Sequence, residues 1–462
     1  MATQSLPREN AISELSQLLG DRLTTSAAVR DQHANGECGV YTPQPPDAVA
    51  FPHSTEEVSA IVSICAAHAV PMVPYGVGTS VEGNVTAPYG GVCIDLSQMN
   101  EVVCVNEADL DCTVQAGVTR KQLNQYLKDT GLFFPIDPGA DATLGGMAAT
   151  RASGTNAVRY GTLRENVLGL TVVLPDGKII KTGGRARKSA AGYDLTRLMV
   201  GSEGTLGVIT EVTLRLYGIP EAISAAMCSF PTLEGAVNTV MLTIQSGIPV
   251  ARMELLDDVQ MDACMRYSKL DYAPDHTLLF EFHGTERGVE EQAQMVGEIA
   301  ADYGGSDFRW TTTTEERNAL WQSRHDVLYA CFALRPGCMV WATDVCVPIS
   351  RLAECLLETK REIEESDLMA PIVGHAGDGN FHVGFLLEPG NEDELDRAKR
   401  VNDNMVARAL AMGGTCTGEH GIGVGKIRYM EAEHGDSVDV MRLIKRSMDP
   451  QNLMNPGKVL AL

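Results

Sequence analysis

The sequence predicts an α+β protein with two main domains, and three observations lead to this prediction. Residues 42–90 alternate short strands with a helix, and residues 90–220 consist of short β-branched segments separated by Gly, Asp and Pro turns. After Pro220, strands alternate with longer helices, which is typical of antiparallel strands backed by helices. The chain has 462 residues, enough for two or three units of about 150 residues each.

Residues 1–41 are expected to form a helical lead-in, which is followed by the Pro-rich segment TPQPPD. Its apolar residues at helical spacing are Ala11, Leu15, Leu18 and Leu19. Another helix is expected to begin after Ser54, because the segment Ser-Thr-Glu-Glu offers a capping side chain and acidic residues for the first turn. A buried strand is expected at 70–73, and PDGK at 175–178 predicts a hairpin turn.

These patterns, together with the absence of a repeat or a long linker in the sequence, set the expected domain boundaries. The lead-in covers 1–41, the first domain covers 42–220, and the second domain covers 221–420. A C-terminal segment covers 421–462, and its return to the first domain is left open.

The charge of the chain disfavours two classes of partner. Lys and Arg total 37 and Asp and Glu total 60, so the formal net charge is −23. A surface this negative repels phosphate backbones and anionic lipid head groups. No apolar run approaches the roughly 20 residues that span a bilayer, and MATQSLPREN resembles neither a signal nor a transit peptide. We expect no nucleic-acid binding, no transmembrane segment and a cytoplasmic location, with peripheral attachment to a membrane left open.

The twelve cysteines are expected to be reduced thiols. They are scattered, without a CxxC motif or the paired spacing of a disulfide framework. Those inside apolar runs include Cys65, Cys93, Cys228 and Cys355. Most of them therefore fit small buried apolar side chains better than disulfides or a metal cluster.

Glycines gather in four regions, at 74–84, 138–162, 201–208 and 374–426. None has G-x-G-x-x-G after a strand, and GIGVGK lacks the spacing and the Ser or Thr of a P-loop. A nicotinamide Rossmann site and a P-loop are therefore unsupported. Each region alone is explained by a tight turn, but several glycine-rich turns together can direct backbone N–H groups at a pyrophosphate. A dinucleotide is the favoured ligand of these loops.

In matching order, the glycine-rich segments resemble the FAD-binding domain of the vanillyl-alcohol-oxidase and p-cresol-methylhydroxylase flavoproteins. The segments are PYGVGTSVEGN, the stretch from PGADATLGG to RENV, and GSEGTLGVITEVTLRL. The resemblance covers roughly residues 42–220. It implies an FAD-binding domain of p-cresol-methylhydroxylase type, followed by a substrate domain built from an antiparallel sheet and helices.

The resemblance also implies three groups of cofactor-binding residues. The first loop would contribute Pro74 and the pyrophosphate-holding amides of Gly76, Val77, Gly78, Thr79 and Ser80. The flavin would be lined by Pro138, Gly139, Thr143, Gly146, Ser153, Asn156, Tyr160 and Gly161. The adenosine half would lie along Glu203, Gly204 and Ile209. Relatives that bond FAD covalently often carry His where this chain has Thr79, so the resemblance implies non-covalent FAD.

The sharpest polar cluster of the second half is GHAGDGNFH, followed by GEHG. Apolar runs on both sides of AGDGN predict a hairpin that brings His375 and His382 side by side. Glu419 lies among glycines, where the backbone can approach closely. Two imidazoles and one carboxylate with open positions suit Zn²⁺, Mn²⁺ or Fe²⁺. The alternative for each histidine is an ordinary hydrogen-bonded loop residue.

The second half resembles the C-terminal domain of FAD-linked 2-hydroxyacid dehydrogenases. The matching segments are RHDVLYACFALRPGC, ATDVCVPISRL, GHAGDGNFH, CTGEHGIGVGK and LMNPGKVL, in the family's order. By this resemblance His375, His382 and Glu419 bind a divalent metal. His420 is then the catalytic base, and Arg324 binds the substrate carboxylate. The implied activity is oxidation of a D-2-hydroxy acid, with D-lactate to pyruvate preferred.

These residue types suit that chemistry. The reaction removes the hydroxyl proton and delivers the Cα hydrogen as hydride to flavin N5, and metal coordination lowers the cost of removing the proton. His420 can accept this proton at neutral pH, since adjacent residues of an extended chain point apart and leave it free when Glu419 binds the metal. The planar guanidinium of Arg324 suits a carboxylate, although the alternative explanation for this residue is a surface salt bridge. Asn380 is a candidate substrate contact, or shapes the turn.

Two rival functions are kept. One is a dehydrogenase for another 2-hydroxy acid, such as 2-hydroxyglutarate or glycolate, but the residues after Arg324 are apolar and favour a small monocarboxylate. They are Val327, Leu328, Tyr329 and Ala330. The other is a flavin-bearing, non-catalytic subunit of a larger complex. The sequence leaves open the electron acceptor, for which a quinone, a cytochrome and an electron-transfer flavoprotein are alternatives, as well as the metal and the oligomeric state.

Overall fold

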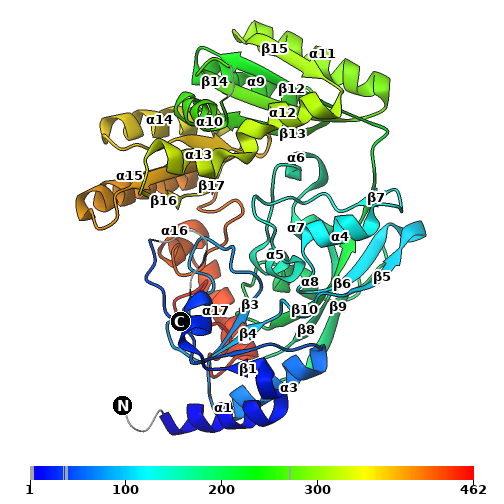
Figure 1. Cartoon of the computed structure of the whole chain (residues 1–462), viewed down its shortest axis with the longest axis vertical. Coiled ribbons are helices and arrows are strands. Elements are labelled where there is room, and N and C mark those ends of the chain that lie inside the picture. Colours follow the sequence, from blue (N-terminus) through cyan, green and yellow to red (C-terminus); the bar gives the residue numbers. More distant parts are fainter. Residues whose placement is uncertain (1–4, 35, 37–39, 270–271) are drawn as a thin grey trace. The chain divides into compact units, whose positions relative to one another are not determined.

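The structure is a computed structural model, and it describes residues 5–34, 36, 40–269 and 272–462. Its contacts divide the chain into two compact units, which we describe separately (Figure 1). Unit 1 comprises Met1–Ser153, Gly161–Ile219 and Glu419–Leu462, and unit 2 comprises Gly154–Tyr160 and Pro220–Gly418. Parts of the expected lead-in, at 1–4, 35 and 37–39, lie outside the described residues.

A four-stranded sheet in unit 1 has the order β1-β2-β4-β3, in which β2, β4 and β3 are parallel. Its strands are β1 (Leu23–Thr24), β2 (Ala48–Ala50), β3 (Met72–Tyr75) and β4 (Val92–Asp95). The helices α1 (Ser5–Leu19) and α3 (Thr55–Ala67) share one buried core with this sheet. As expected, Ser54 caps α3 by accepting the N–H of Glu57 at 3.2 Å. Leu18, one of the four apolar residues of the lead-in, is 41% exposed.

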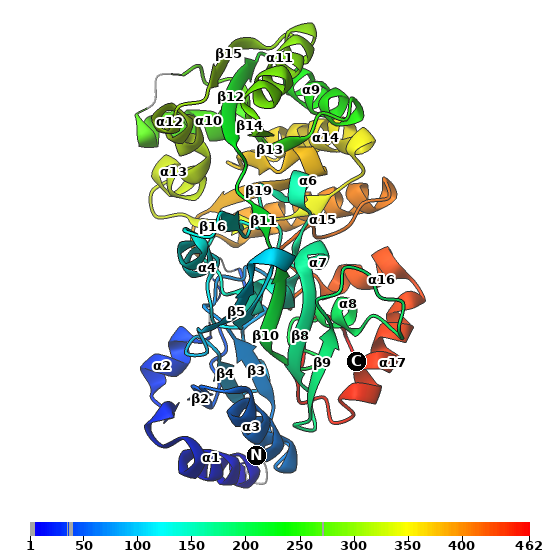
Figure 2. The ribbon, with the colours of Figure 1, turned by 90° about the vertical axis from the view of Figure 1, so that its right-hand side faces the viewer.

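The second sheet of unit 1 is antiparallel, with the order β5-β6-β10-β8-β9. Its strands are β5 (Val102–Asn106), β6 (Asp111–Gln115), β8 (Val167–Val173), β9 (Ile179–Gly183) and β10 (Val208–Arg215). Figure 2 shows β10, β8 and β9 side by side. The predicted hairpin turn joins β8 to β9, where Gly177 has a φ of +83° that favours glycine. A two-stranded ribbon pairs β7 (Leu132–Phe133) with β11 (Tyr217–Gly218).

Further helices of unit 1 are α2 (Ala27–Gln32), α4 (Arg120–Leu127), α5 (Leu144–Thr150), α7 (Leu163–Asn166), α8 (Leu195–Met199), α16 (Met430–His434) and α17 (Ser437–Met448). Its short 3₁₀ turns are η1 (Gly20–Arg22), η2 (Glu107–Asp109) and η5 (Ile427–Tyr429). The C-terminal part of the unit joins the parallel sheet directly, because the N–H of Met72 donates to the carbonyl of Leu453 at 2.7 Å.

Unit 2 is built on an antiparallel sheet of the order β15-β12-β14-β13-β18-β19-β16, with β17 also paired to β19. Its strands are β12 (Ala222–Phe230), β13 (Val250–Leu256), β14 (His276–Gly284), β15 (Ser306–Thr311), β16 (Met339–Ala342), β17 (Val345–Cys346), β18 (Ile372–Gly374) and β19 (Asn380–Leu387). Apolar side chains of β12 and β14 belong to the cores of the unit.

Helices cover both faces of this sheet (Figure 2). They are α6 (Ala157–Tyr160), α9 (Leu233–Gln245), α10 (Asp258–Ser268), α11 (Glu286–Asp302), α12 (Thr314–His325), α13 (Val327–Leu334), α14 (Leu352–Glu365) and α15 (Glu392–Ala411), with the turns η3 (Ile349–Arg351) and η4 (Ala376–Asp378). A core cluster joins β12, β13 and β14 to α10, α12 and α13. The same face carries the polar residues described below.

The predicted α+β fold class, with a mainly antiparallel second domain, is confirmed. The eleven cysteines among the described residues are free thiols, as expected, while Cys38 lies outside them. Within the described part of the chain, no helix combines the length and the apolar character needed to cross a membrane.

Candidate active site

The histidines His375 and His382 lie on one hairpin of unit 2. The strands β18 and β19 pair antiparallel around the turn η4, and Gly379 at its end has a φ of +76°. The ring centroids of the two histidines are 5.4 Å apart, and the rings are nearly perpendicular. Both residues are buried, with exposed fractions of 5% and 8%. The hairpin therefore brings the imidazoles together as expected, while their role as metal ligands stays a prediction.

The hydrogen bonds of the two rings determine which nitrogen carries the lone pair. His375 Nδ1 lies 2.8 and 3.0 Å from the two carboxylate oxygens of Glu254, and His382 Nδ1 lies 3.0 Å from the carbonyl oxygen of Thr343. A carboxylate and a carbonyl only accept, so each Nδ1 donates and the neutral ring keeps its lone pair on Nε2. Metal-binding histidines are held in this way. The donor set therefore fits a divalent cation.

Glu254 is the residue of this site that sequence reasoning missed. It lies on β13, it has no exposed surface, and its Oε2 accepts from Nε of Arg324 at 2.7 Å. Burial alone would raise the pKa of the Glu254 carboxyl, but the charges and hydrogen bonds of His375 and Arg324 hold it below its ordinary value. Its only signal in the sequence is an acidic residue inside the apolar strand ARMELL.

Arg324 lies in the last turn of α12, with its side chain 17% exposed. Arg324 therefore makes a largely buried ion pair with Glu254, and not the surface salt bridge considered as the alternative to a substrate contact. Because Nε of Arg324 donates to Glu254, the two terminal guanidinium nitrogens are the atoms suited to a substrate carboxylate.

The apolar residues after Arg324 pack within the protein or face outward. Val327 and Ala330 belong to the core around α10, and Leu328 packs against a second core cluster. Tyr329 is 61% exposed. The packing and exposure of these four residues need no substrate to explain them. Their apolar character is therefore no evidence for a small substrate.

Asn380 uses its amide hydrogens within the protein. Its Nδ2 donates to Oδ1 of Asp344 at 2.6 Å and to the carbonyl of Val345 at 2.7 Å. Asp344 is buried and also accepts from Oγ1 of Thr417 at 2.6 Å. Asn380 therefore holds Asp344 near the hairpin, and only its amide oxygen suits a substrate contact.

Glu419 and His420 open the C-terminal part of unit 1, whereas the hairpin histidines belong to unit 2. Glu419 is nevertheless tied covalently to the hairpin region. Gly418, which precedes it, lies so close to Asn380 that a Cβ there would meet Nδ2 at 2.4 Å. Consecutive Cα atoms are about 3.8 Å apart, so Glu419 starts close to this region. The role of Glu419 as the third ligand stays a prediction.

Within unit 1, His420 lies beside a second acidic residue that sequence reasoning missed. Nδ1 of His420 is 3.7 Å from Oε1 of Glu82, whose side chain also pairs with Lys426 at 3.2 Å. Oε2 of Glu82 accepts from the hydroxyl of Tyr41 at 2.8 Å. Burial opposes ionisation, but Lys426 and His420 lower the pKa of Glu82. The carboxylate of Glu82 therefore lies next to Nδ1 of the predicted base, and Nε2 is the ring nitrogen that would accept a proton from a substrate.

The first glycine-rich loop fits a pyrophosphate. A Cβ on Gly76 would lie 2.3 Å from Oγ1 of Thr143, which caps α5, so the loop and this helix pack closely. In the described part of the chain, the structure shows no acceptor for the N–H groups of Val77, Gly78 and Thr79. Unpaired N–H groups of such turns are the usual phosphate donors. The residues present therefore fit FAD.

The other predicted FAD residues fall in both units. Ser153 and Gly161 belong to unit 1, but Asn156 and Tyr160 lie in the segment Gly154–Tyr160 of unit 2. Tyr160 is hydrogen-bonded to Nδ1 of His283 at 2.7 Å. That these residues together line the flavin stays a prediction. The positions of the remaining predicted residues, all in unit 1, are Pro74 in β3, Pro138 and Gly139 before α5, Gly146 in α5, Ser80 in the first loop, Gly204 before β10 and Ile209 in β10.

The side chain of Glu203 is hydrogen-bonded to the C-terminal part of unit 1. Its carboxylate accepts the N–H groups of Ile422 and Gly423 at 2.6 and 2.9 Å. Nδ2 of Asn84 donates to it at 2.6 Å. Burial raises the pKa of Glu203 despite these bonds. The side chain thus joins three segments of unit 1, and a contact with adenosine would have to come from its backbone or from its neighbours.

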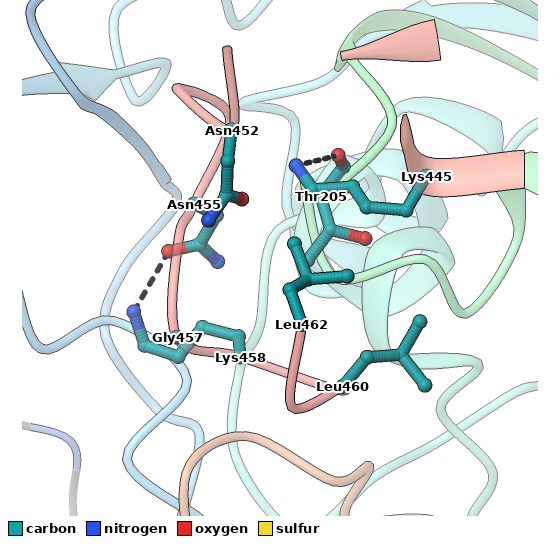
Figure 3. A pocket seen from close by; sticks show the side chains of 8 residues that line it. All are labelled: Thr205, Lys445, Asn452, Asn455, Gly457, Lys458, Leu460 and Leu462. Atoms are coloured by element: carbon teal, nitrogen blue, oxygen red, sulfur yellow. Dashed lines mark hydrogen bonds between the residues drawn. The ribbon is translucent and has the colours of Figure 1, made fainter. Parts of the chain in front are cut away.

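A pocket in the C-terminal part of unit 1 is lined by two buried lysines and by asparagines (Figure 3). Lys458 donates to the carbonyl of Thr86 at 2.6 Å and to Oδ1 of Asn455 at 2.8 Å. Lys445 donates to the carbonyl of Thr205 at 2.8 Å and is also paired with Asp449. These bonds link the C-terminal part of unit 1 to the segments of the same unit that contain Thr86 and Thr205.

Two family models match the chain, one in each half. Residues 46–183 match an FAD binding domain, and residues 219–459 match the C-terminal domain of FAD linked oxidases. The second match alone covers more than half of the 462 residues.

Individual proteins agree with these matches. "Probable D-lactate dehydrogenase, mitochondrial" of Danio rerio is 53% identical over 98% of this chain and 92% of its own. "D-lactate dehydrogenase (cytochrome), mitochondrial" of Arabidopsis thaliana is 48% identical over 99% of this chain and 81% of its own. The crystal structure of p-cresol methylhydroxylase with substrate bound has a TM-score of 0.78 at 18% identity, covering 98% of this chain and 96% of that one, so the fold is shared. The chain therefore belongs to the FAD-linked oxidases.

Proposed function

We propose that the chain is an FAD-dependent dehydrogenase of D-2-hydroxy acids that prefers D-lactate and releases pyruvate. The names of its relatives support the substrate class. The observation that carries the proposal is the buried imidazole pair, whose Nδ1 hydrogens are held by Glu254 and Thr343, with an arginine on the same Glu254. This arrangement offers metal ligands and a carboxylate-binding group in one place.

Within this proposal, His375, His382 and Glu419 hold one divalent cation, of Zn²⁺, Mn²⁺ or Fe²⁺ type. Bound there, the cation supplies Lewis-acid chemistry at the substrate hydroxyl. The protein orients the two imidazoles through the acceptors on Nδ1. Asp344, held by Asn380 and Thr417, lies 3.8 Å from Nδ1 of His382 and adds negative charge behind that ring.

Arg324 binds the substrate carboxylate through its terminal nitrogens, and its bond to Glu254 sets the plane of the guanidinium. A carboxylate held at two points cannot rotate, so one face of Cα is presented for reaction. His420 accepts the hydroxyl proton, and Glu82 favours the resulting imidazolium by its charge. FAD, when bound, supplies the acceptor for the Cα hydrogen and its electron pair.

Two finer points belong to this proposal. FAD is held without a covalent bond, because the first loop presents Thr79 where covalent relatives often present His. Precipitation with acid should release all of the yellow colour into the supernatant, and colour that stays in washed pellet would contradict this. The electron acceptor is a quinone, a cytochrome or an electron-transfer flavoprotein. The cytoplasmic location is not confirmed, since both relatives have names ending in "mitochondrial".

The experiment that tests the proposal is anaerobic bleaching of the purified yellow protein. D-Lactate should reduce the flavin without any partner protein, L-lactate should not, and D-2-hydroxyglutarate and glycolate should react more slowly. A chelator should stop bleaching while FAD stays bound. His420→Ala should slow bleaching about 10²–10⁴-fold with a smaller effect on substrate affinity. A protein that no 2-hydroxy acid bleaches would be the non-catalytic alternative.

A further inference from the structure

We propose that Glu254 is a positioning residue that serves both functional groups of the site, holding the ring of His375 and the guanidinium of Arg324 with one carboxylate. The inference rests on the proposed function, which assigns His375 to the cation and Arg324 to the substrate. It adds that cation binding and substrate binding share one buried residue.

The geometry of the carboxylate carries this inference. Oε1 lies 2.8 Å from Nδ1 of His375, and Oε2 lies 2.7 Å from Nε of Arg324. The two partners come from different elements of unit 2, since His375 follows β18 and Arg324 lies in the last turn of α12. Glu254 stands on β13, the strand that pairs with β18 through Leu255 and Gly374. It is the shared contact of two elements that would otherwise have to orient their side chains independently.

Neutralisation of charge explains only half of this arrangement. A fully buried carboxylate needs an opposite charge and hydrogen bonds, and Arg324 supplies the charge. The contact with Nδ1 of His375 also lowers the pKa of the Glu254 carboxyl, but it has a second effect. It does what a carboxylate behind a metal-binding histidine does, which is to set the tautomer and the ring orientation.

The inference predicts the same two effects from two different substitutions of Glu254. Glu254→Gln keeps the size of the side chain but leaves one accepting oxygen, so one of the two partners loses its acceptor. Glu254→Asp keeps the charge opposite Arg324 but is one methylene shorter, so it cannot reach both partners. Each change should weaken cation binding about 10–100-fold, the usual effect of removing a partner behind a metal ligand. Each should also raise KM for D-lactate.

Unit 2 offers a matched control in Glu281. This carboxylate is also buried, bonded to a histidine (His283, 2.8 Å) and paired with an arginine (Arg252, 3.4 Å), one strand away on β14. Glu281→Gln should leave cation affinity unchanged. A general loss of stability after replacing a buried carboxylate would instead affect both variants.

The experiment is titration of the FAD-loaded, chelator-treated protein with Mn²⁺ alone, followed by the electron paramagnetic resonance signal of free Mn²⁺. Retained yellow colour and circular dichroism check the fold, and Glu254→Asp replaces Glu254→Gln if the latter loses FAD. Weakened Mn²⁺ binding in the Glu254 variants only, with a raised KM, is the expected result. Wild-type affinity in Glu254→Gln and Glu254→Asp would overturn the inference alone. A wild type that binds no Mn²⁺, Zn²⁺ or Fe²⁺ would overturn the proposed cation site and this inference together.

Discussion

Two clusters on neighbouring strands of unit 2 have the same composition and different geometry. In the first, Glu254 contacts His375 and Arg324. In the second, Glu281 contacts His283 and Arg252. In both, the neighbouring charges lower the pKa of the buried carboxyl although burial opposes this. Composition alone therefore does not tell which cluster could hold a metal.

The two clusters differ in which ring nitrogen of the histidine is hydrogen-bonded to the carboxylate. Glu254 takes Nδ1 of His375, which leaves the lone pair on Nε2, and a second imidazole lies 5.4 Å away between ring centroids. Glu281 takes Nε2 of His283, and Nδ1 of that ring bonds to the hydroxyl of Tyr160 at 2.7 Å. Both nitrogens of His283 are thus in use. The first cluster is the one that we propose as a cation site, and the second is a hydrogen-bonded chain of Glu281, His283 and Tyr160.

The largest expected effect follows from removing one histidine from each cluster. His375→Ala should lose the cation and slow flavin reduction by D-lactate about 10³-fold or more, since Lewis-acid assistance is worth several kcal/mol. His283→Ala should keep the cation. Elemental analysis by mass spectrometry and rapid-mixing measurement of flavin bleaching check both. A cation retained in His375→Ala, or lost in His283→Ala, would remove the distinction between the clusters.

A smaller effect is expected from the arginines. Arg324→Ala should raise KM for D-lactate and slow reduction, lowering kcat/KM about 10–100-fold, because a charge-assisted contact is worth about 1.5–3 kcal/mol. Arg324→Lys should restore only part of this, since an ammonium lacks the planar fork. Arg252→Ala should change KM less, because Arg252 is held by Asn156 and stacks over Trp321 at 5.1 Å. Steady-state kinetics decide, and equal effects of the two arginines would contradict the assignment.

The fold and the histidine hairpin could be predicted because their signals are local. The cap at Ser54, the turn at Gly177 and the hairpin between His375 and His382 each lie within ten residues of sequence. Periodicity and turn chemistry act over that range. The same signals identified the fold class of both halves.

The partners behind the site residues could not be predicted, because they come from distant segments. Glu254 lies 121 positions from His375 in the sequence, and Glu82 and His420 come from different segments of unit 1. Nothing in the sequence marks Gly154–Tyr160 as packing with unit 2, although the chain on both sides packs with unit 1. Such pairings are determined by tertiary packing, which no local pattern encodes.

Lys458 extends the comparison to a buried cation whose hydrogen-bond partners, among the described residues, are a carbonyl and an amide instead of a carboxylate. Here burial prevails. It lowers the pKa of Lys458 from 10.5 to about 8, although the charge of Glu203 opposes the shift.

The pH dependence of stability gives the smallest expected effect. Below about pH 8 Lys458 is protonated in both the folded and the unfolded state, so this residue does not make the stability depend on pH. Between about pH 8 and 10.5 the unfolded state binds more protons than the folded state, so stability must rise with pH. Relative to Lys458→Met, the wild type should gain on the order of 1 kcal/mol between pH 7 and 9. Lys458→Arg, which stays charged, should lack the gain as well. Thermal unfolding of the three proteins at pH 7, 8 and 9 measures it, and parallel curves would show that the ammonium is not desolvated by the fold.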